Sequence, residues 1–376
     1  MILKIIYGLL ILGIIVFIHE MGHFIAAIKC GVKVDAFSIG MGPVLIHKKI
    51  KNIDWRISLF PVGGYCAMKG EKDIQDAIEN DSTEFYAEKD SLYGVSAYKR
   101  ALIAFAGPFA NLLLTFTSFF LIALIGYTYY SASNEIQLAS ELYPGIYSPA
   151  ESAGIKTGDK IVRINKTDIN DFSQLYQTVA LHPDEVLEIQ VKRNNELLKF
   201  NVKTELDKES GAGKIGVVSI PSTIQIRQAK RYNFPNALIQ AGKETVSIFF
   251  ATINGIKTLF KGVKVTQAVS GPASITTMLG ETVTSGFSEG LRNGITSIFN
   301  FIALISISLF IMNLLPIPVL DGGLILFSII ETIFRIRISP KIRYRVQYIG
   351  LAFIAFLFVI AMISDFNYFM RLFNEK

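Results

Sequence analysis

Residues 2–28 read ILKIIYGLLILGIIVFIHEMGHFIAAI, an apolar run that contains the pentapeptide HEMGH at positions 19–23. The run is longer than the ~20 residues that a helix needs to cross a bilayer, so we predict a membrane span. On a helix, side chains four residues apart lie on one face, which lets His19 and His23 bind one metal ion. Glu20 beside them is placed to act on a metal-bound water instead of binding the metal. Charged side chains at the centre of an apolar helix cost roughly 2–3 kcal/mol each, which disfavours a chance match.

A second unusual stretch, NLLPIPVLDGG at 313–323, interrupts an apolar segment near the other end of the chain. Its prolines break a helix, and broken backbone at membrane depth is tolerated only against protein or a water-filled cavity. A catalytic zinc ion takes three protein ligands and keeps a fourth position for water, whose pKa falls to about 7. We therefore expect Asp321 to be the third ligand, on non-helical backbone near the cytosolic end of a span. An ordinary helix end with an aspartate cap is the competing interpretation.

The composition is that of a membrane protein. Of the 376 residues, 51% are hydrophobic and 18% charged, whereas soluble domains have about a quarter charged residues. The first apolar run continues past the core of a signal peptide and lacks a small-residue cleavage site, so we expect it to remain as a span. A fifth span near 244–260 is an alternative, although polar residues interrupt it. The predicted spans lie near residues 2–28, 101–129, 295–315 and 347–364.

Lysine and arginine crowd the segments 29–100 and 335–345, which we therefore place in the cytosol. Both termini and the long 131–294 segment then lie outside, and the active site opens to the cytosol. Juxtamembrane basic residues also account for the formal net charge of +6. No basic patch interleaved with aromatic residues argues for a nucleic-acid partner. Cys30 and Cys66 fall in the first cytosolic segment, which indicates free thiols.

The outside segment begins with a small α+β domain at 131–225, where the composition returns to that of a soluble protein. Residues 226–294 follow it with amphipathic helices that we expect to lie at the outer membrane interface. The predicted elements of the domain are a strand at 161–164, a helix at 172–181 and a hairpin over 186–202 that turns at Asn194-Asn195.

Three short segments between the first two spans are typical of strands with glycine turns. They are FSIGMGP at 37–43, WRISL at 55–59 and PVGGYCAM at 61–68. A plain cytosolic hairpin accounts equally well for this local sequence.

With these motifs, the chain resembles the site-2 protease family of intramembrane zinc metalloproteases, in its bacterial PDZ-containing branch (the regulator of sigma-E protease type). The resemblance covers nearly the whole chain, and HEMGH together with NLLPIPVLDGG is its most specific part. In one departure, we find a single PDZ-like domain where some relatives carry two. The other carriers are FSIGMGP at 37–43, PVGGYCAMKG at 61–70, AGPFANLLL at 106–114, AESAGIKTGDKIVRIN at 150–165 and SGPASI at 270–275.

We therefore predict a multi-span α-helical membrane protein with about four transmembrane helices, a membrane-associated β-hairpin region and one extracytoplasmic PDZ-like α+β domain. Its parts would be a first membrane half at 1–130, the PDZ-like domain at 131–225, interfacial helices at 226–294 and a second membrane half at 295–376.

The resemblance also implies roles for individual residues. Glu20 would be the general base and then the proton donor to the leaving amine, and Asn313 would bind substrate or the developing oxyanion. The segment at 37–43 would be a membrane-reentrant β-loop, and the segment at 61–68 a substrate-binding edge strand. The zinc ligands would be His19, His23 and Asp321. The substrate-binding residues would be Gly40, Gly42, Gly63, Gly64 and Tyr65.

The expected function is that of an intramembrane zinc metalloprotease in the bacterial inner membrane. Its substrates would be single-span membrane proteins, such as anti-sigma factors or remnant signal peptides, with the lipid bilayer and an upstream site-1-type protease as further partners. The alternative is a membrane metal-ion transporter, which leaves Glu20 and the PDZ-like domain unexplained. A catalytically dead PDZ scaffold is a third hypothesis, and the intact HEMGH and Asp321 argue against it.

Overall fold

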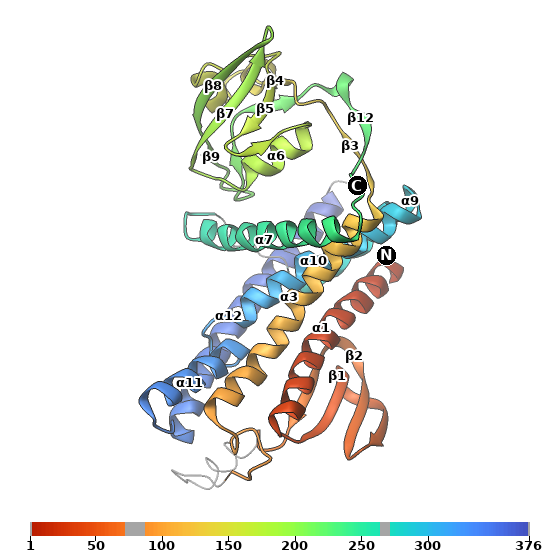
Figure 1. The fold of residues 1–376 in the computed structure, drawn as a ribbon, viewed down its shortest axis with the longest axis vertical. Helices are drawn as coiled ribbons and strands as arrows, with labels where there is room; N and C mark the ends of the chain where they lie inside the picture. The colour runs from red at the N-terminus through yellow and green to blue at the C-terminus, as the bar shows by residue number, and fades with distance from the viewer. Residues whose placement is uncertain (1, 72–86, 264–270, 375–376) are drawn as a thin grey trace. The chain divides into compact units, whose positions relative to one another are not determined.

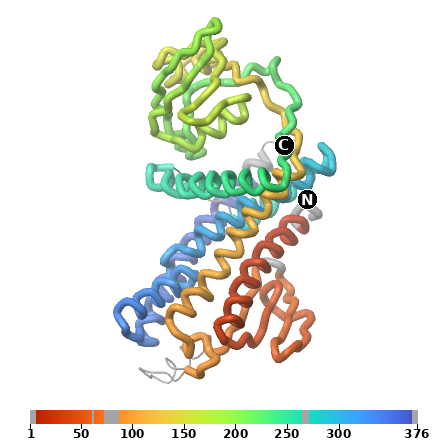
Figure 2. The backbone as a smooth tube through the Cα atoms, in the orientation of Figure 1, coloured from red at the N-terminus to blue at the C-terminus, as the bar shows by residue number. Residues whose placement is uncertain are grey.

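The computed structural model describes residues 2–71, 87–263 and 271–374 (Figure 1, Figure 2). The chain divides into two compact units, each described by itself below. Unit 1 comprises Met1–Ile125, Asn233–Ile248 and Gly271–Lys376, and unit 2 comprises Gly126–Tyr232 and Phe249–Ser270.

Four helices of the described residues are long and apolar enough to cross a membrane, and each overlaps a predicted span. The fifth candidate span falls in α7 (Phe234–Leu259), which is not among these four. The second predicted span ends too late: α3 stops at Ile125, Gly126 has a left-handed φ of +65°, and Tyr129 already lies in a strand. The four helices are α1 (Ile2–Cys30), α3 (Ala97–Ile125), α10 (Leu291–Asn313) and α12 (Pro340–Asn374).

Glycines let the helices of unit 1 approach one another closely. A side chain at Gly22 of α1 would meet the Ala106 carbonyl oxygen of α3. One at Gly8 would meet Thr276 of α9 (Pro272–Ser288). Among lipid tails, such close packing is a main source of helix association. Helix α3 contacts α1, α10 and α11 (Asp321–Phe334), and is therefore the central helix of the unit.

A buried group of charges connects three of these helices. Glu331 of α11 accepts hydrogen bonds from the guanidinium groups of Arg100 on α3 and Arg343 on α12. It also accepts one from the Ile338 backbone N–H at 3.0 Å. Breaking a buried ion pair by removing one partner costs about 3–5 kcal/mol, because a charge is left unpaired. The group therefore fixes α11 near its end, opposite the end that begins with Asp321.

Strands β1 (Val34–Ile50) and β2 (Ile53–Met68) form an antiparallel hairpin beside the C-terminal half of α1 (Figure 1). Its turn residues Lys51 and Asn52 have φ of 51° and 67°, as in a type I′ turn. The hairpin also folds back on itself, because residues 36–39 pair with 64–67 on one side and with 54–57 on the other. Residues 64–68 thus form one edge of the described sheet. The short strands expected from the sequence are therefore parts of two long ones.

Aromatic rings hold this hairpin against α1. Phe37 of β1 is fully buried. Its ring contacts those of Phe17 and Phe24 from α1 and Trp55 from β2, at centroid distances of 5.8, 5.5 and 5.1 Å. The contact fixes the position of the sheet edge relative to the HEMGH segment of α1.

The outer part of the hairpin is apolar on both faces. Val44, Leu45 and Ile46 follow one another in β1, and all three are exposed. Consecutive side chains of a strand point to opposite faces, so neither face is covered here. Such a surface is stable in lipid and poorly suited to water. This pattern favours membrane association of the hairpin.

Asp90 connects the two ends of the hairpin. Its carboxylate lies 2.6 Å from Lys33 Nζ, just before β1, and 2.8 Å from Lys69 Nζ, just after β2. Hydrogen bonds from these two ammonium groups lower the pKa of Asp90 to about 2.

Unit 2 is an α+β fold built on a four-stranded antiparallel sheet of order β6-β5-β7-β8. The strand, helix and hairpin expected between 161 and 202 are observed, and Asn194 and Asn195 form the turn with φ of 49° and 70°. The core side chains Ile161, Ile189 and Val191 are fully buried. These elements are β5 (Lys160–Ile164), β6 (Thr167–Asp168), α6 (Phe172–Ala180), β7 (Val186–Arg193) and β8 (Glu196–Lys203).

Shorter elements complete unit 2. Three further strand pairs are β3 with β12, β4 with β11, and β9 with β10. Their bounds are β3 (Thr128–Ser131), β4 (Ile136–Leu138), β9 (Glu205–Leu206), β10 (Gly213–Lys214), β11 (Val217–Ser219) and β12 (Gln225–Gln228), with short helices α4 (Ala139–Leu142) and α5 (Pro149–Ser152).

Candidate metal centre

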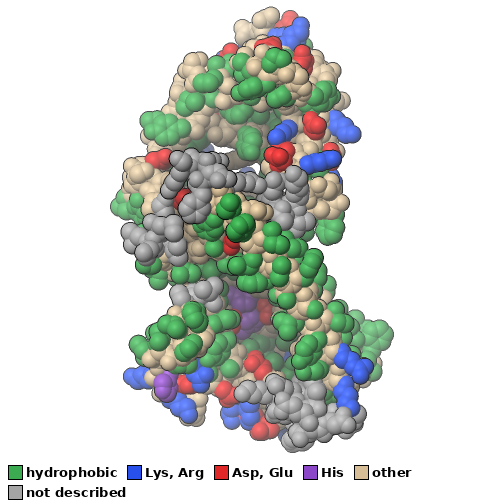
Figure 3. Space-filling view, turned by 180° about the vertical axis from the view of Figure 1, so that it is seen from behind, with side chains coloured by type: hydrophobic (Ala, Val, Ile, Leu, Met, Phe, Trp, Pro, Cys, Tyr) green, Lys and Arg blue, Asp and Glu red, His purple; other side chains and the backbone are tan. Residues whose placement is uncertain are grey.

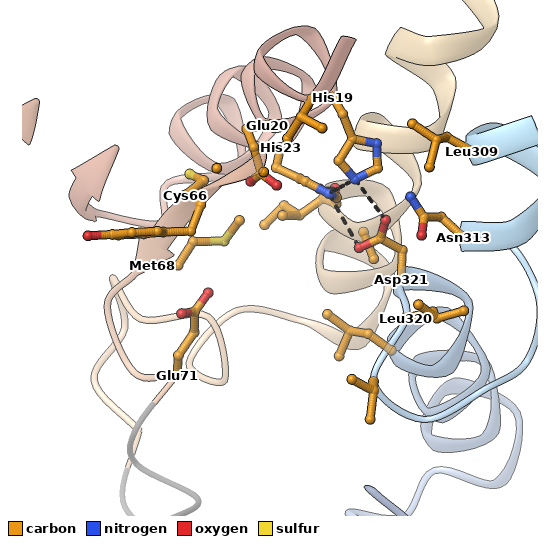
Figure 4. Close-up of a pocket in the computed structure, with 18 of the residues that line it drawn as sticks. His19, Glu20, His23, Cys66, Met68, Glu71, Leu309, Asn313, Leu320 and Asp321 are labelled. Carbon is orange, nitrogen blue, oxygen red and sulfur yellow. Dashed lines mark hydrogen bonds and ion pairs between the residues drawn. The ribbon is translucent and has the colours of Figure 1, made fainter. Parts of the chain in front are cut away.

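His19, His23 and Asp321 lie together in unit 1, although Asp321 is far from the histidines in sequence (Figure 4). The histidines are four residues apart on α1, and Asp321 is the first residue of α11. The two Nε2 atoms are 3.2 Å apart, and each lies 3.3 Å from a different carboxylate oxygen of Asp321. Within the described ranges, no other group of His, Cys, Asp and Glu side chains is arranged to hold a metal ion.

These donor atoms fit a zinc ion. Tetrahedral zinc with bonds of about 2.0–2.1 Å places neighbouring ligand atoms about 3.3 Å apart. The Nε2–Nε2 separation of 3.2 Å matches one edge of such a tetrahedron, and the Asp321 carboxylate lies 3.3 Å from each of these nitrogens through a different oxygen. Two imidazole nitrogens and one carboxylate are also a ligand set typical of catalytic zinc, which leaves one position for water.

The backbone before Asp321 is irregular, as expected, but Asp321 itself lies on a helix. Helix α10 ends at Asn313 and α11 begins at Asp321. The expectation of non-helical backbone at this residue is therefore wrong. The two glycines that follow do not form a turn but allow α11 to pack closely against the preceding loop. A side chain at Gly322 or Gly323 would collide with carbonyl oxygens of that loop. A carboxylate in the first turn of a helix is also electrostatically favourable.

The three side chains open into a cavity of about 520 Å³, whose walls include residues of α1, β1, β2, α3, α10 and α11. Figure 3 shows histidine and acidic side chains in a hollow between apolar ones. Glu20 and Asn313 line the same cavity, and Asn313 is beside Asp321 in Figure 4. The carboxylate of Glu20 accepts a hydrogen bond from the Cys66 backbone N–H of β2. The predicted base therefore lies between the candidate ligands and the edge of the sheet.

Three of the five predicted substrate-binding residues, Gly63, Gly64 and Tyr65, line this cavity. Gly40 and Gly42 are not among the lining residues. They have left-handed φ of 88° and 86° at the bend of β1, and a side chain at Gly40 would collide with carbonyl oxygens of β2. Their observed role is to let the hairpin fold back on itself.

The sequence did not predict the residues that contact the outer nitrogens of the imidazoles. His23 Nδ1 lies 2.8 Å from the Ile103 carbonyl oxygen, and His19 Nδ1 lies 3.1 Å from the Asn111 side-chain nitrogen. Both partners are on α3. Asn111 could have been noticed in the sequence as a polar residue within the apolar run AGPFANLLL at 106–114. The contact of the Ile103 backbone carbonyl leaves no trace in the sequence. Glu71, just after β2, also lines the cavity without having been predicted.

Known proteins resemble this chain over nearly its whole length. A protein of Treponema pallidum named "Putative zinc metalloprotease" is 33% identical, in an alignment that covers 97% of this chain and 99% of that protein. Similarly named proteins of Campylobacter jejuni and Clostridium acetobutylicum are 31% and 30% identical. Those alignments cover 95% and 97% of this chain, and 92% and 98% of the two relatives.

The family profile of Peptidase family M50 matches residues 7–357. The match includes both the HEMGH segment and Asp321, and it reaches all four candidate spans, ending within the fourth. Relatives named as zinc metalloproteases and four apolar helices lead to the same assignment. The chain thus belongs to peptidase family M50, the site-2 proteases, and is a multi-pass membrane zinc metalloprotease.

Proposed function

We propose that this protease cuts the transmembrane segments of single-span membrane proteins, with His19, His23 and Asp321 as its zinc ligands. The observation that carries the proposal is a shared cavity, which the three ligands, Glu20 and the edge of β2 all line. The HEMGH segment lies inside α1, one of the candidate spans. A substrate at this cavity is therefore cut at membrane depth.

The chemistry follows from the lining of the cavity. When bound, zinc lowers the pKa of a coordinated water to about 7 and so supplies a nucleophile at neutral pH. Glu20 accepts a proton from the attacking water as general base and later donates it to the leaving amine. Asn313, on the wall beside Asp321, donates from its amide to the substrate carbonyl oxygen as negative charge develops there.

The edge of β2 supports a mechanism for holding the substrate. Carbonyl groups of a transmembrane helix are hydrogen-bonded within that helix, so some turns must open before cleavage. Opening in lipid leaves unsatisfied amides, which cost several kcal/mol per group. Residues 64–68 form an edge of the described sheet, and Gly64 and Tyr65 face the cavity. We propose that the opened substrate pairs with this edge as an added strand.

We also propose the membrane topology and the role of the outer domain. Basic residues in the segments 29–100 and 335–345 favour a cytosolic opening of the cavity, with four spans and both termini outside. The 131–225 segment would be a PDZ-like domain that screens the outer parts of substrates, followed by interfacial helices at 226–294. The membrane halves would be 1–130 and 295–376, in the bacterial inner membrane. Anti-sigma factors and remnant signal peptides are suitable substrates, and an upstream site-1-type protease would first shorten them.

The metal-ion transporter is not favoured. Transport requires a series of ionisable groups along a pathway through the membrane. In the part of the chain that the structure describes, His19, His23 and Asp321 form the single candidate metal group.

Substitution of Glu20 tests the proposed chemistry. We expect the purified parent protein to hold one zinc ion and to cut a single-span substrate in liposomes. Glu20→Gln should keep the zinc and reduce cleavage about 100-fold or more, because an amide cannot accept the proton. Metal analysis and a cleavage assay on the same samples measure both effects.

Asp321→Ala is the matched variant and should lose zinc as well as cleavage, because an anionic ligand is removed. Cleavage at the parent rate by Glu20→Gln would assign the base to another residue. Full zinc content in Asp321→Ala would remove Asp321 from the site.

A further inference from the structure

The asparagine of α3 that faces His19 has no part in the chemistry above. Asn111 is completely buried, and its side-chain nitrogen lies 3.1 Å from His19 Nδ1. Its side-chain oxygen has no hydrogen-bond partner among the described residues. An imidazole that binds a metal through Nε2 carries its proton on Nδ1, so two donors would face each other here. That arrangement is incompatible with a metal-bound His19.

A rotation of the Asn111 amide by half a turn removes the conflict. The oxygen and nitrogen of an asparagine amide have nearly the same shape, and only their hydrogen bonds distinguish them. After the rotation, Asn111 Oδ1 accepts a hydrogen bond from His19 Nδ1–H. The proton is then fixed on Nδ1, and the lone pair of Nε2 is directed at the ion.

The same helix orients the second histidine. His23 Nδ1–H donates to the Ile103 carbonyl oxygen at 2.8 Å, which fixes the corresponding tautomer of His23. Pro108 lies within α3 and has no N–H, so the helical hydrogen-bond ladder is interrupted next to this carbonyl. The N–H missing at Pro108 would have paired with the Ala104 carbonyl, and His23 contacts the neighbouring Ile103 carbonyl in the same turn of the helix.

The spacing along α3 matches the spacing of the ligands along α1. Residues 103, 107 and 111 are four apart and therefore lie on one face, as do His19 and His23. Gly107, between the two contacts, has no side chain, and one there would collide with the His23 ring. One face of α3 thus contacts both imidazoles on the side away from the candidate ion.

We propose that Asn111 is a positioning residue for the metal centre, with its Oδ1 accepting the Nδ1–H of His19. The inference rests on the proposed zinc ligands and gives the run AGPFANLLL a role, since it contains both Gly107 and Asn111. Together with the Ile103 carbonyl, it completes the set of hydrogen bonds that hold both imidazoles with Nε2 toward the ion. Loss of such partners typically lowers metal affinity about 10–100-fold.

Zinc affinity of three variants tests this role without any cleavage assay. Asn111→Leu keeps the branched shape of the side chain, in a larger volume, and removes the acceptor, whereas Asn111→Asp keeps an acceptor at the same place. Ser118→Ala is the matched control, because Ser118 is also buried on α3 and its hydroxyl has no hydrogen-bond partner among the described residues. Metal-free full-length protein in detergent is titrated with zinc against a chromophoric chelator, and with cobalt for its ligand-field spectrum.

We expect Asn111→Leu to bind zinc about 10–100-fold more weakly and to give an altered cobalt spectrum. Asn111→Asp should stay within a few-fold of the parent, and Ser118→Ala should equal it. The inference is overturned if Asn111→Leu binds as tightly as the parent. It is also overturned if Asn111→Asp is as weak as Asn111→Leu, because packing and not the acceptor would then be responsible.

Failure of the positioning role of Asn111 can be distinguished from failure of the proposed function. A parent protein that binds zinc and cuts substrate, with an unaffected Asn111→Leu, defeats only the positioning role. A parent protein that binds no zinc defeats the metal site and this inference together.

Discussion

Gly107 shows how closely one residue of α3 fits the histidines of α1. A side chain at this position would overlap the His23 imidazole. Glycine inside a helix is normally less stable than alanine by about 0.5–1 kcal/mol, so helix propensity alone favours its replacement. The local preference and the requirements of the metal site therefore act in opposite directions at this residue.

We expect Gly107→Ala to weaken zinc binding about tenfold or more and to reduce cleavage in parallel, because the His23 ring must move. Gly242→Ala is the control, since Gly242 is also helical and has open space around its missing side chain. Zinc content per chain and cleavage rate measure the effect. Full zinc occupancy in Gly107→Ala would show that the ring tolerates the displacement.

At this scale the sequence predicted which candidate ligands come together, but not the residues that surround them. The spacing of His19 and His23 is a local property of a helix, and Asp321 stands out beside two prolines in an apolar run. Asn111 and the Ile103 carbonyl act only because α3 packs against α1 in one register. That register depends on close contacts such as the one at Gly22, which no local pattern reports.

Among the elements, the hairpin and α11 depart most from expectation. Glycine-rich stretches in β1 and β2 suggested turns between short strands, but the strands continue through them with bends and shifts of register. Helix α11 was not predicted, because the glycines after Asp321 were interpreted as part of the irregular stretch. Its far end is held by Glu331 between two arginines, a contact between residues distant in sequence. Each of these features depends on tertiary packing.

Pairing of the substrate with the edge of β2 predicts a preference for weak helices. Replacing leucine near the scissile bond by glycine should speed cleavage by several-fold to about tenfold, because about 1 kcal/mol of the opening cost is already removed. Matched substrates that differ at this position, assayed in liposomes, provide the measurement.

The same sequences presented as short unstructured peptides should be cut at similar rates, since they have no helix to open. Equal cleavage of stiff poly-leucine spans and glycine-containing spans would rule out strand addition while leaving the zinc chemistry intact.

For the whole molecule, composition predicted the division into a membrane part and a soluble-like part. The observed unit 2 begins at Gly126, before the predicted start of the outer domain at residue 131. It also includes Phe249–Ser270, which follow later in the chain. Helix α7 extends over both ranges, so hydrophobic periodicity alone could not place that boundary. The helices expected over 226–294 are represented by α7 and α9, while residues 264–270 lie outside the described residues.

The pairing of β3 with β12 shows where the proposed screening domain can be removed without separating the two ends of the chain. Ser131 of β3 pairs directly with Gln225 of β12, so residues 132–224 can be replaced by an Asn-Gly turn. We expect this variant to cut a substrate with a short outer tail at the parent rate. It should also cut substrates with bulky outer domains, which we expect the parent to reject.

Rates for both substrates in the same liposomes measure this prediction, and the deletion combined with Glu20→Gln shows that the cleavage comes from this site. Loss of all activity in a stably folded deletion would mean that the outer domain contributes to catalysis itself.

The position of the three candidate ligands along the chain has a consequence for biosynthesis. His19 and His23 are translated about 300 residues before Asp321. A nascent chain with its first spans already inserted still lacks one ligand, so it cannot hold the ion as the finished protein does. With Asp321 as the third ligand, such a chain would be unable to cut proteins that are inserted beside it. A prematurely terminated product that ends before α11 would be harmless for the same reason.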